Sequence, residues 1–202
     1  RQDIAYAAEL GYRIKLLAIA KGSDGRLEIR VHPTMIPATS PLAAVSGVFN
    51  AVFIRGDAVG DLMFYGRGAG QMPTASAVWS DVLEIARSLA HGVSSHSVEL
   101  PSIAARPLPL QPMDEIRCAY YLRVMALDRP GVLSQVAGIL GQHSISIASV
   151  LQKGRAAAEA VPVVMMTHEA READMRHALQ AIDKLPVVAG KTISIRVEGG
   201  DL

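Results

Sequence analysis

The sequence predicts an α+β protein built from two blocks that are joined by a proline-rich segment. Apolar residues make up 50% of the 202 residues, which is enough for a real hydrophobic core. Helix-type and strand-type apolar spacings alternate along the chain. Residues 93–118 have no such periodicity and contain four prolines. We therefore expect a linker there, between a domain at residues 1–92 and a domain at residues 119–202.

The first block is expected to contain, in chain order, a helix, four strands and a second helix. The expected ranges are 3–10, 12–20, 27–31, 50–54, 60–65 and 74–89. Asp3 is the expected N-cap of the first helix, and Gly11 is its expected stop. Residues 32–42 contain three prolines, which argues against a regular helix or a central strand in that segment.

The second block has the order strand, helix, strand, strand, helix, strand. The expected ranges are 120–127, 132–142, 145–152, 161–167, 170–184 and 192–197. This order joins two strand–helix units in the ferredoxin-like βαββαβ arrangement. We expect four antiparallel strands with both helices on one face.

Composition argues against several classes of protein. The net charge is +1 and no segment is rich in Lys or Arg, which disfavours a nucleic-acid partner. The single cysteine, Cys118, excludes an intrachain disulfide and fits a reducing compartment. No apolar stretch approaches the ~20 residues that span a bilayer, and we expect no signal peptide. The six histidines do not form a zinc-binding helix pattern, so we expect a cytoplasmic protein without a metal site or a membrane partner.

Two short segments have the residues of a ligand site. The loop at residues 66–70 (GRGAG) follows a predicted strand and precedes a predicted helix, as phosphate-binding loops do. A close-packed turn is the alternative, because no strand with a ribose-binding acid follows that helix. In the second block, Pro130 and Gly131 form a turn before a helix whose first N–H groups suit a carboxylate. Asp128 could cap that helix or bind the ammonium of an amino acid.

The second block resembles an ACT domain, which is a small amino-acid-sensing module. The resemblance rests on the runs 127–134 (LDRPGVLS) and 143–152 (HSISIASVLQ). It implies that a free amino acid binds at the turn between the first strand and the first helix. The residues implied in that binding are Asp128, Pro130, Gly131, Val132, Leu133, Ile145 and Gln152.

The first block resembles the C-terminal part of the homoserine dehydrogenase catalytic domain. The matching runs, in family order, are 9–18 (ELGYRIKLLA), 31–34 (VHPT), 47–52 (GVFNAV), 56–60 (GDAVG), 63–70 (MFYGRGAG) and 73–78 (PTASAV). The resemblance implies an enzyme of threonine and methionine biosynthesis that interconverts L-homoserine and L-aspartate 4-semialdehyde with NAD or NADP. It implies cofactor contacts at Gly68, Ala69, Gly70 and Thr74.

The same resemblance implies feedback by L-threonine and a dimer or tetramer formed through the catalytic-domain sheet and the ACT domains. The family's nucleotide-binding domain, its catalytic lysine and its homoserine-binding carboxylates are expected upstream of Arg1. We therefore expect a piece of a longer enzyme, with no catalytic residue, no bound cofactor and no activity of its own. Lys15 is expected to face solvent, and His32 to be a hydrogen-bonded residue that orders the proline-rich turn.

Two other functions remain compatible with the second block. The chain could be a free-standing, non-enzymatic regulator that binds an amino acid. It could also be the ACT appendage of another enzyme, such as an aspartate kinase or phosphoglycerate dehydrogenase. The VHPT and GRGAG runs of the first block argue against both alternatives.

Overall fold

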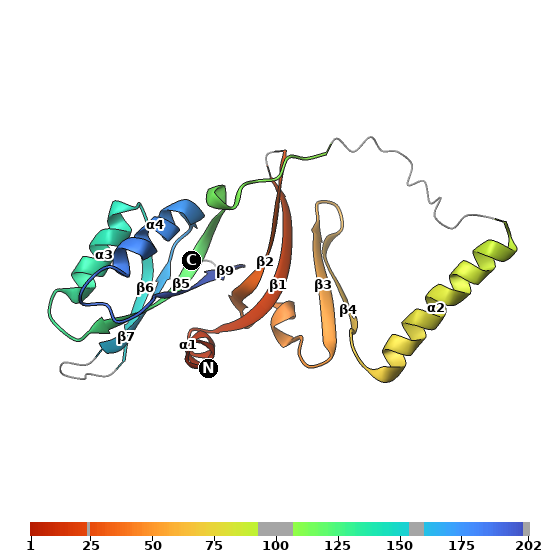
Figure 1. Cartoon of the computed structure of the whole chain (residues 1–202), viewed down its shortest axis with the longest axis horizontal. Coiled ribbons are helices and arrows are strands. Elements are labelled where there is room, and N and C mark those ends of the chain that lie inside the picture. Colours follow the sequence, from red (N-terminus) through yellow and green to blue (C-terminus); the bar gives the residue numbers. More distant parts are fainter. Residues whose placement is uncertain (24, 93–106, 154–159, 200–202) are drawn as a thin grey trace. The chain divides into compact units, whose positions relative to one another are not determined.

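The computed structural model describes residues 1–23, 25–92, 107–153 and 160–199. These residues form two compact units, shown in Figure 1. The first unit combines residues 1–43 with residues 108–202, and the second unit is residues 44–107.

The elements of the first unit are α1 Gln2–Glu9, β1 Tyr12–Ser23, β2 Arg26–Pro37, β5 Arg117–Leu127, α3 Val132–Gln142, β6 Ile147–Gln152, β7 Ala160–Thr167, β8 Ala170–Arg171, α4 Glu172–Ile182 and β9 Ile193–Val197. The second unit contains β3 Phe49–Gly56, β4 Gly60–Arg67 and α2 Gln71–Ala90. Short 3-10 turns lie at Pro41–Ala44 and Met113–Glu115.

The α+β class and the ferredoxin-like order of the second block are confirmed. Strands β9, β5, β7 and β6 lie side by side in that order, and all three pairings are antiparallel. The helices α3 and α4 lie together on one face of this sheet (Figure 1).

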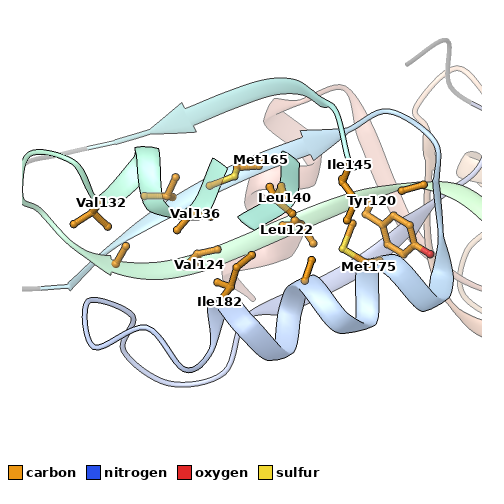
Figure 2. Packing of buried hydrophobic residues seen from close by; sticks show 14 of the residues in the cluster. Tyr120, Leu122, Val124, Val132, Val136, Leu140, Ile145, Met165, Met175 and Ile182 are labelled. Atoms are coloured by element: carbon orange, nitrogen blue, oxygen red, sulfur yellow. The ribbon is translucent and has the colours of Figure 1, made fainter. Parts of the chain in front are cut away.

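Alternating side chains of β5 divide the buried residues into two clusters. Tyr120, Leu122 and Val124 belong to the cluster under α3 and α4, which Figure 2 shows from close by. Ala119 and Tyr121 belong to a second cluster, to which α1 contributes. Since side chains on a strand point alternately to opposite faces, the sheet is covered on both faces.

The hairpin of β1 and β2 extends the ferredoxin-like sheet. Strand β2 pairs in parallel with β9, through Thr34 with Arg196 and Met35 with Val197. The prediction that residues 32–42 contain no central strand is therefore wrong for residues 32–37. Pro33 and Pro37 flank the two residues that pair with β9, so the missing proline N–H groups lie outside that pairing.

Buried charges accompany this pairing. Arg30 on β2 is only 4% exposed and forms ion pairs with Glu198, just after β9, and with Glu28, whose Oε1 lies 2.6 Å from the Arg30 Nε. Burial alone would lower the pKa of Arg30, but the two carboxylates outweigh it and raise that pKa. The Glu198 backbone N–H also donates to the Met35 carbonyl, at 2.9 Å.

A further ion pair holds the helix α1. Asp3 accepts two hydrogen bonds from Arg123 on β5, at 2.6 and 3.1 Å, and one from the Tyr121 hydroxyl at 3.0 Å. The prediction that Asp3 caps α1 is wrong, because the N-cap position is Arg1 and no side chain caps the helix. The Asp3 carboxylate fixes α1 on the sheet instead.

The two compact units have different boundaries from the domains predicted at 1–92 and 119–202. Residues 1–43 group with the ferredoxin-like block, while residues 44–107 group by themselves. Within the predicted linker 93–118, residues 93–106 lie outside the described residues, and Arg117 and Cys118 already belong to β5. The linker therefore stays a prediction.

We expect Glu172 to make the folded state sensitive to acid. Burial raises its pKa, but hydrogen bonds from Arg196 and Tyr120 outweigh burial and hold that pKa below the ordinary value of 4.5. A lowered carboxyl pKa stabilises the fold above pH 4.5, and this contribution is lost as the pH falls through the folded pKa. Glu172→Gln should cost about 2 kcal/mol in urea unfolding at pH 7.

The same substitution should reduce the loss of stability between about pH 5 and about pH 3, which is the range in which ordinary glutamates titrate. Glu169→Gln is the matched control, because Glu169 is an exposed carboxylate close by in the chain. Equal acid sensitivity in both variants would contradict the assignment.

Candidate functional site

A cavity of about 230 Å³ lies where β5 turns into α3. The predicted effector residues that line it are Asp128, Pro130, Gly131, Val132, Leu133 and Gln152. Ile145 is not among the lining residues, and it packs in the hydrophobic core with an exposed fraction of 3%. Seven further lining residues were not predicted: Val124, Ala126, Leu127, Arg129, Val136, Val163 and Met165.

The cavity has an apolar wall and a polar rim. Val124, Val163 and Met165 come from β5 and β7 and belong to or border the buried core under α3. Gln152 Nε2 donates to Asp128 Oδ1 across 3.4 Å, so the ends of β6 and β5 meet at the rim. The arrangement offers one surface for an aliphatic group and another for polar groups.

Gly131 is the N-cap residue of α3. Its φ of 85° lies in the left-handed region that glycine adopts without strain. No side chain caps the helix, so the suggestion that Asp128 is the cap is wrong, and its carboxylate remains at the rim. The first turn of α3 presents N–H groups without intrahelical partners, which suits a carboxylate.

The predicted cofactor residues lie in the second unit, where all of them are exposed. Gly68, Ala69 and Gly70 form the turn between β4 and α2, and Gly70 is the N-cap residue with a φ of 125°. Thr74 ends the first turn, where its N–H donates to the Gly70 carbonyl at 3.0 Å. No acidic side chain lies in that turn, so these residues fit an anionic group such as a phosphate.

Packing supplies a second reason for glycine at position 68. A Cβ there would lie 1.7 Å from the Nδ2 atom of Asn50 on β3. The Gly68 N–H donates to the Val48 carbonyl at 2.8 Å, which holds the loop against the hairpin. The close-packed turn and the phosphate loop are therefore both compatible with this geometry.

Comparison with known proteins assigns both blocks of the chain. Residues 1–83 match the homoserine dehydrogenase family, and residues 120–187 match the ACT domain. A homoserine dehydrogenase of Neisseria gonorrhoeae is 45% identical over 202 residues, which cover 98% of this chain and 46% of that protein. A homoserine dehydrogenase of Helicobacter pylori is 43% identical, covering 97% of this chain and 45% of that protein.

A crystal structure of a homoserine dehydrogenase from Thiobacillus denitrificans superposes with a TM-score of 0.81 at 43% identity. The match covers 98% of this chain and 45% of that one. Residues 1–83 are thus similar to homoserine dehydrogenases in the family match, in the relatives and in this structure. In this chain that segment is followed by the ACT match, which lies within the predicted range 119–202. The chain spans about half the length of the curated relatives that it matches.

His32 lies in the homoserine dehydrogenase segment, on β2. It is half-buried, and its Nδ1 lies 3.1 Å from the Pro33 carbonyl and 3.0 Å from the Thr34 hydroxyl. Burial lowers the pKa of His32, so the imidazole is neutral near pH 7. These contacts agree with the predicted role of ordering the proline-containing segment.

Sequence reasoning missed a charged cluster at the other end of the ACT domain. Glu172 accepts hydrogen bonds from Arg196 at 2.7 and 2.5 Å and from the Tyr120 hydroxyl at 2.7 Å. These residues lie far apart in the chain and belong to no short motif, so the sequence carries no signal for them. Cys118 is buried close by, and burial raises the pKa of its thiol, which makes it a weak nucleophile.

Two further functions find no support in the part of the chain that the structure describes. There, no group of three or more His, Cys, Asp or Glu side chains is arranged to hold a metal ion. None of the described helices combines the length and the apolar character needed to cross a bilayer.

Proposed function

We propose that this chain supplies the C-terminal part of the catalytic domain and the regulatory module of a homoserine dehydrogenase. The complete enzyme would interconvert L-homoserine and L-aspartate 4-semialdehyde in threonine and methionine biosynthesis, in the cytoplasm. The observation that supports this most is the match of one relative across both blocks, at 45% identity over 98% of the chain. A free-standing amino-acid sensor would have no need of the first block.

The chemistry of hydride transfer would belong to NAD or NADP. In this proposal, the N–H groups at the start of α2 bind an anionic part of the cofactor, and Gly68, Ala69, Gly70 and Thr74 shape that contact. No residue of this chain is assigned to proton transfer. We also propose a dimer or tetramer, formed through the catalytic-domain strands and the ACT domains.

The regulatory part of the proposal is that L-threonine binds the cavity at the β5–α3 turn. Its carboxylate would meet the first N–H groups of α3, and its ammonium would pair with Asp128. Gln152 at the rim would reach the ligand's hydroxyl or amine. The cavity is smaller than the roughly 300–1,000 Å³ typical of drug-sized ligands, which fits a single amino acid.

Enzyme activity tests the catalytic proposal. The full-length protein should reduce NAD or NADP in the presence of L-homoserine, followed by absorbance of the reduced nicotinamide. The 202-residue chain alone should show no turnover, because the family's nucleotide-binding domain and catalytic lysine are expected outside it. Turnover by the isolated chain, or none by the full-length protein, would refute the proposal.

The threonine proposal is tested by calorimetric titration of the chain. We expect Asp128→Asn to weaken threonine binding about tenfold, since the charged partner of the ammonium is removed. Asp81→Asn is the matched control, because Asp81 is an exposed carboxylate on α2 in the other unit. The absence of both heat and thermal shift with millimolar threonine would reject this function of the cavity.

The cofactor proposal needs a test that separates cofactor contact from packing. Gly68→Ala alone would collide with Asn50, so we compare Asn50→Ala with Asn50→Ala/Gly68→Ala in the full-length enzyme. The double variant should raise the KM for the nucleotide about tenfold over the single variant, because a Cβ keeps a phosphate away from the loop backbone. Equal KM values in two equally stable variants would show that glycine serves packing alone.

A further inference from the structure

A second cavity, of about 280 Å³, lies in the ACT domain between α4 and the start of β9. Tyr120 and Met175 line it, whereas Val132 and Val136 line the cavity at the β5–α3 turn, which is called the effector cavity here after its proposed ligand. All four side chains belong to one hydrophobic core, and Figure 2 shows the two pairs at opposite ends of it. The two cavities are therefore separate sites on one domain.

Some of the charged groups around the second cavity already have partners within the fold. The Glu172 carboxylate already accepts hydrogen bonds from Arg196 and Tyr120, and Arg176 is paired with Asp114 at 2.5 and 3.0 Å. These two lining groups are thus neutralised by partners of their own.

One cation and one anion remain on the cavity wall. Within the described part of the chain, the Lys191 ammonium forms no ion pair and no side-chain hydrogen bond. Asp183, the C-cap residue of α4, accepts the Thr192 N–H with Oδ1 at 2.8 Å, which leaves acceptor positions on the carboxylate.

A buried hydroxyl on the same wall lacks a partner. Thr192 lines the cavity and is only 5% exposed, yet its Oγ1 has no hydrogen-bond partner among the described residues. Buried hydroxyl groups are nearly always hydrogen-bonded, so an orphaned one next to a cavity indicates a missing polar group. Met175 and Leu179 add an apolar part to the lining.

We propose that this second cavity binds a free α-amino acid. Lys191 would bind its carboxylate, Asp183 its ammonium, and Met175 with Leu179 its side chain. The cavity and its unpaired charges support a zwitterion over other small ligands. A phosphate would face the Asp183 and Glu172 carboxylates, and a simple cation would face Lys191, whereas one positive and one negative group on the ligand satisfy both. This site goes beyond the proposed function, which places threonine in the other cavity.

The experiment titrates the 202-residue chain with each of the common amino acids at millimolar concentration, followed by backbone amide NMR. We expect at least one amino acid to shift the amide signals of Thr192 and Ser194. Lys191→Gln and Asp183→Asn should each weaken that binding about tenfold, because each removes one charged partner of the zwitterion. Lys184→Gln is the matched control, since Lys184 is exposed nearby and does not line the cavity, and it should leave the affinity unchanged.

Three results would overturn the proposal. The Thr192 and Ser194 signals could stay unchanged with every amino acid, or the affinity could be the same in Lys191→Gln as in the parent chain. Alternatively, Asp128→Asn could abolish the shifts while Lys191→Gln leaves them, which would assign binding to the effector cavity alone. Asn at position 183 can still accept the Thr192 N–H, and if that variant nevertheless unfolds, Lys191→Gln decides. Failure of threonine binding at the first cavity would leave these outcomes unaffected.

Discussion

The parallel pairing of β2 with β9 is the contact on which the arrangement of the first unit depends. It involves only two residue pairs, at Thr34 and Met35, and both side chains are fully buried. Through it, a hairpin from the homoserine dehydrogenase segment becomes part of the ACT-domain sheet. The same sheet then carries α3 and α4 on one face and α1 on the other, so residues 1–43 and the module share one folded body.

Ion pairs specify the register of the strands in this unit more than they contribute to its stability. The pairs of Arg30 with Glu198 and of Asp3 with Arg123 bridge segments distant in the chain, whereas Glu28 pairs with Arg30 from the same strand, and all three pairs are largely removed from water. Desolvation offsets much of the attraction in such pairs, but losing one partner leaves a buried charge that costs about 3–5 kcal/mol. A shift in strand register would separate such a pair and would therefore incur that cost. Exposed pairs such as Arg55 with Asp61 carry little weight by comparison.

Local patterns in the sequence were sufficient for most of the elements and for six of the residues that line the cavity at the β5–α3 turn. The residues from Asp128 to Leu133 form one turn, so a short motif places them together. Ile145, just before β6, packs in the core and does not line this cavity, and the motif does not specify that orientation. The pairing of β2 with β9 could not be predicted, since prolines in the segment argued against a strand and its partner lies about 160 residues away. The second cavity combines β5, α4 and β9, which no local spacing reveals.

The cavity at the β5–α3 turn and the N-terminal helix contact opposite faces of the same strands. On β5, Val124 lines the cavity while the adjacent Arg123 holds Asp3 of α1. On β7, Val163 and Met165 line the cavity, and Val164 between them packs in the cluster under α1. In a close-packed interior, a strand cannot move toward a ligand on one face without changing the contacts on the other. Any ligand that prefers one position of these strands must therefore also bias how α1 packs, and the bias equals its difference in affinity for the two positions.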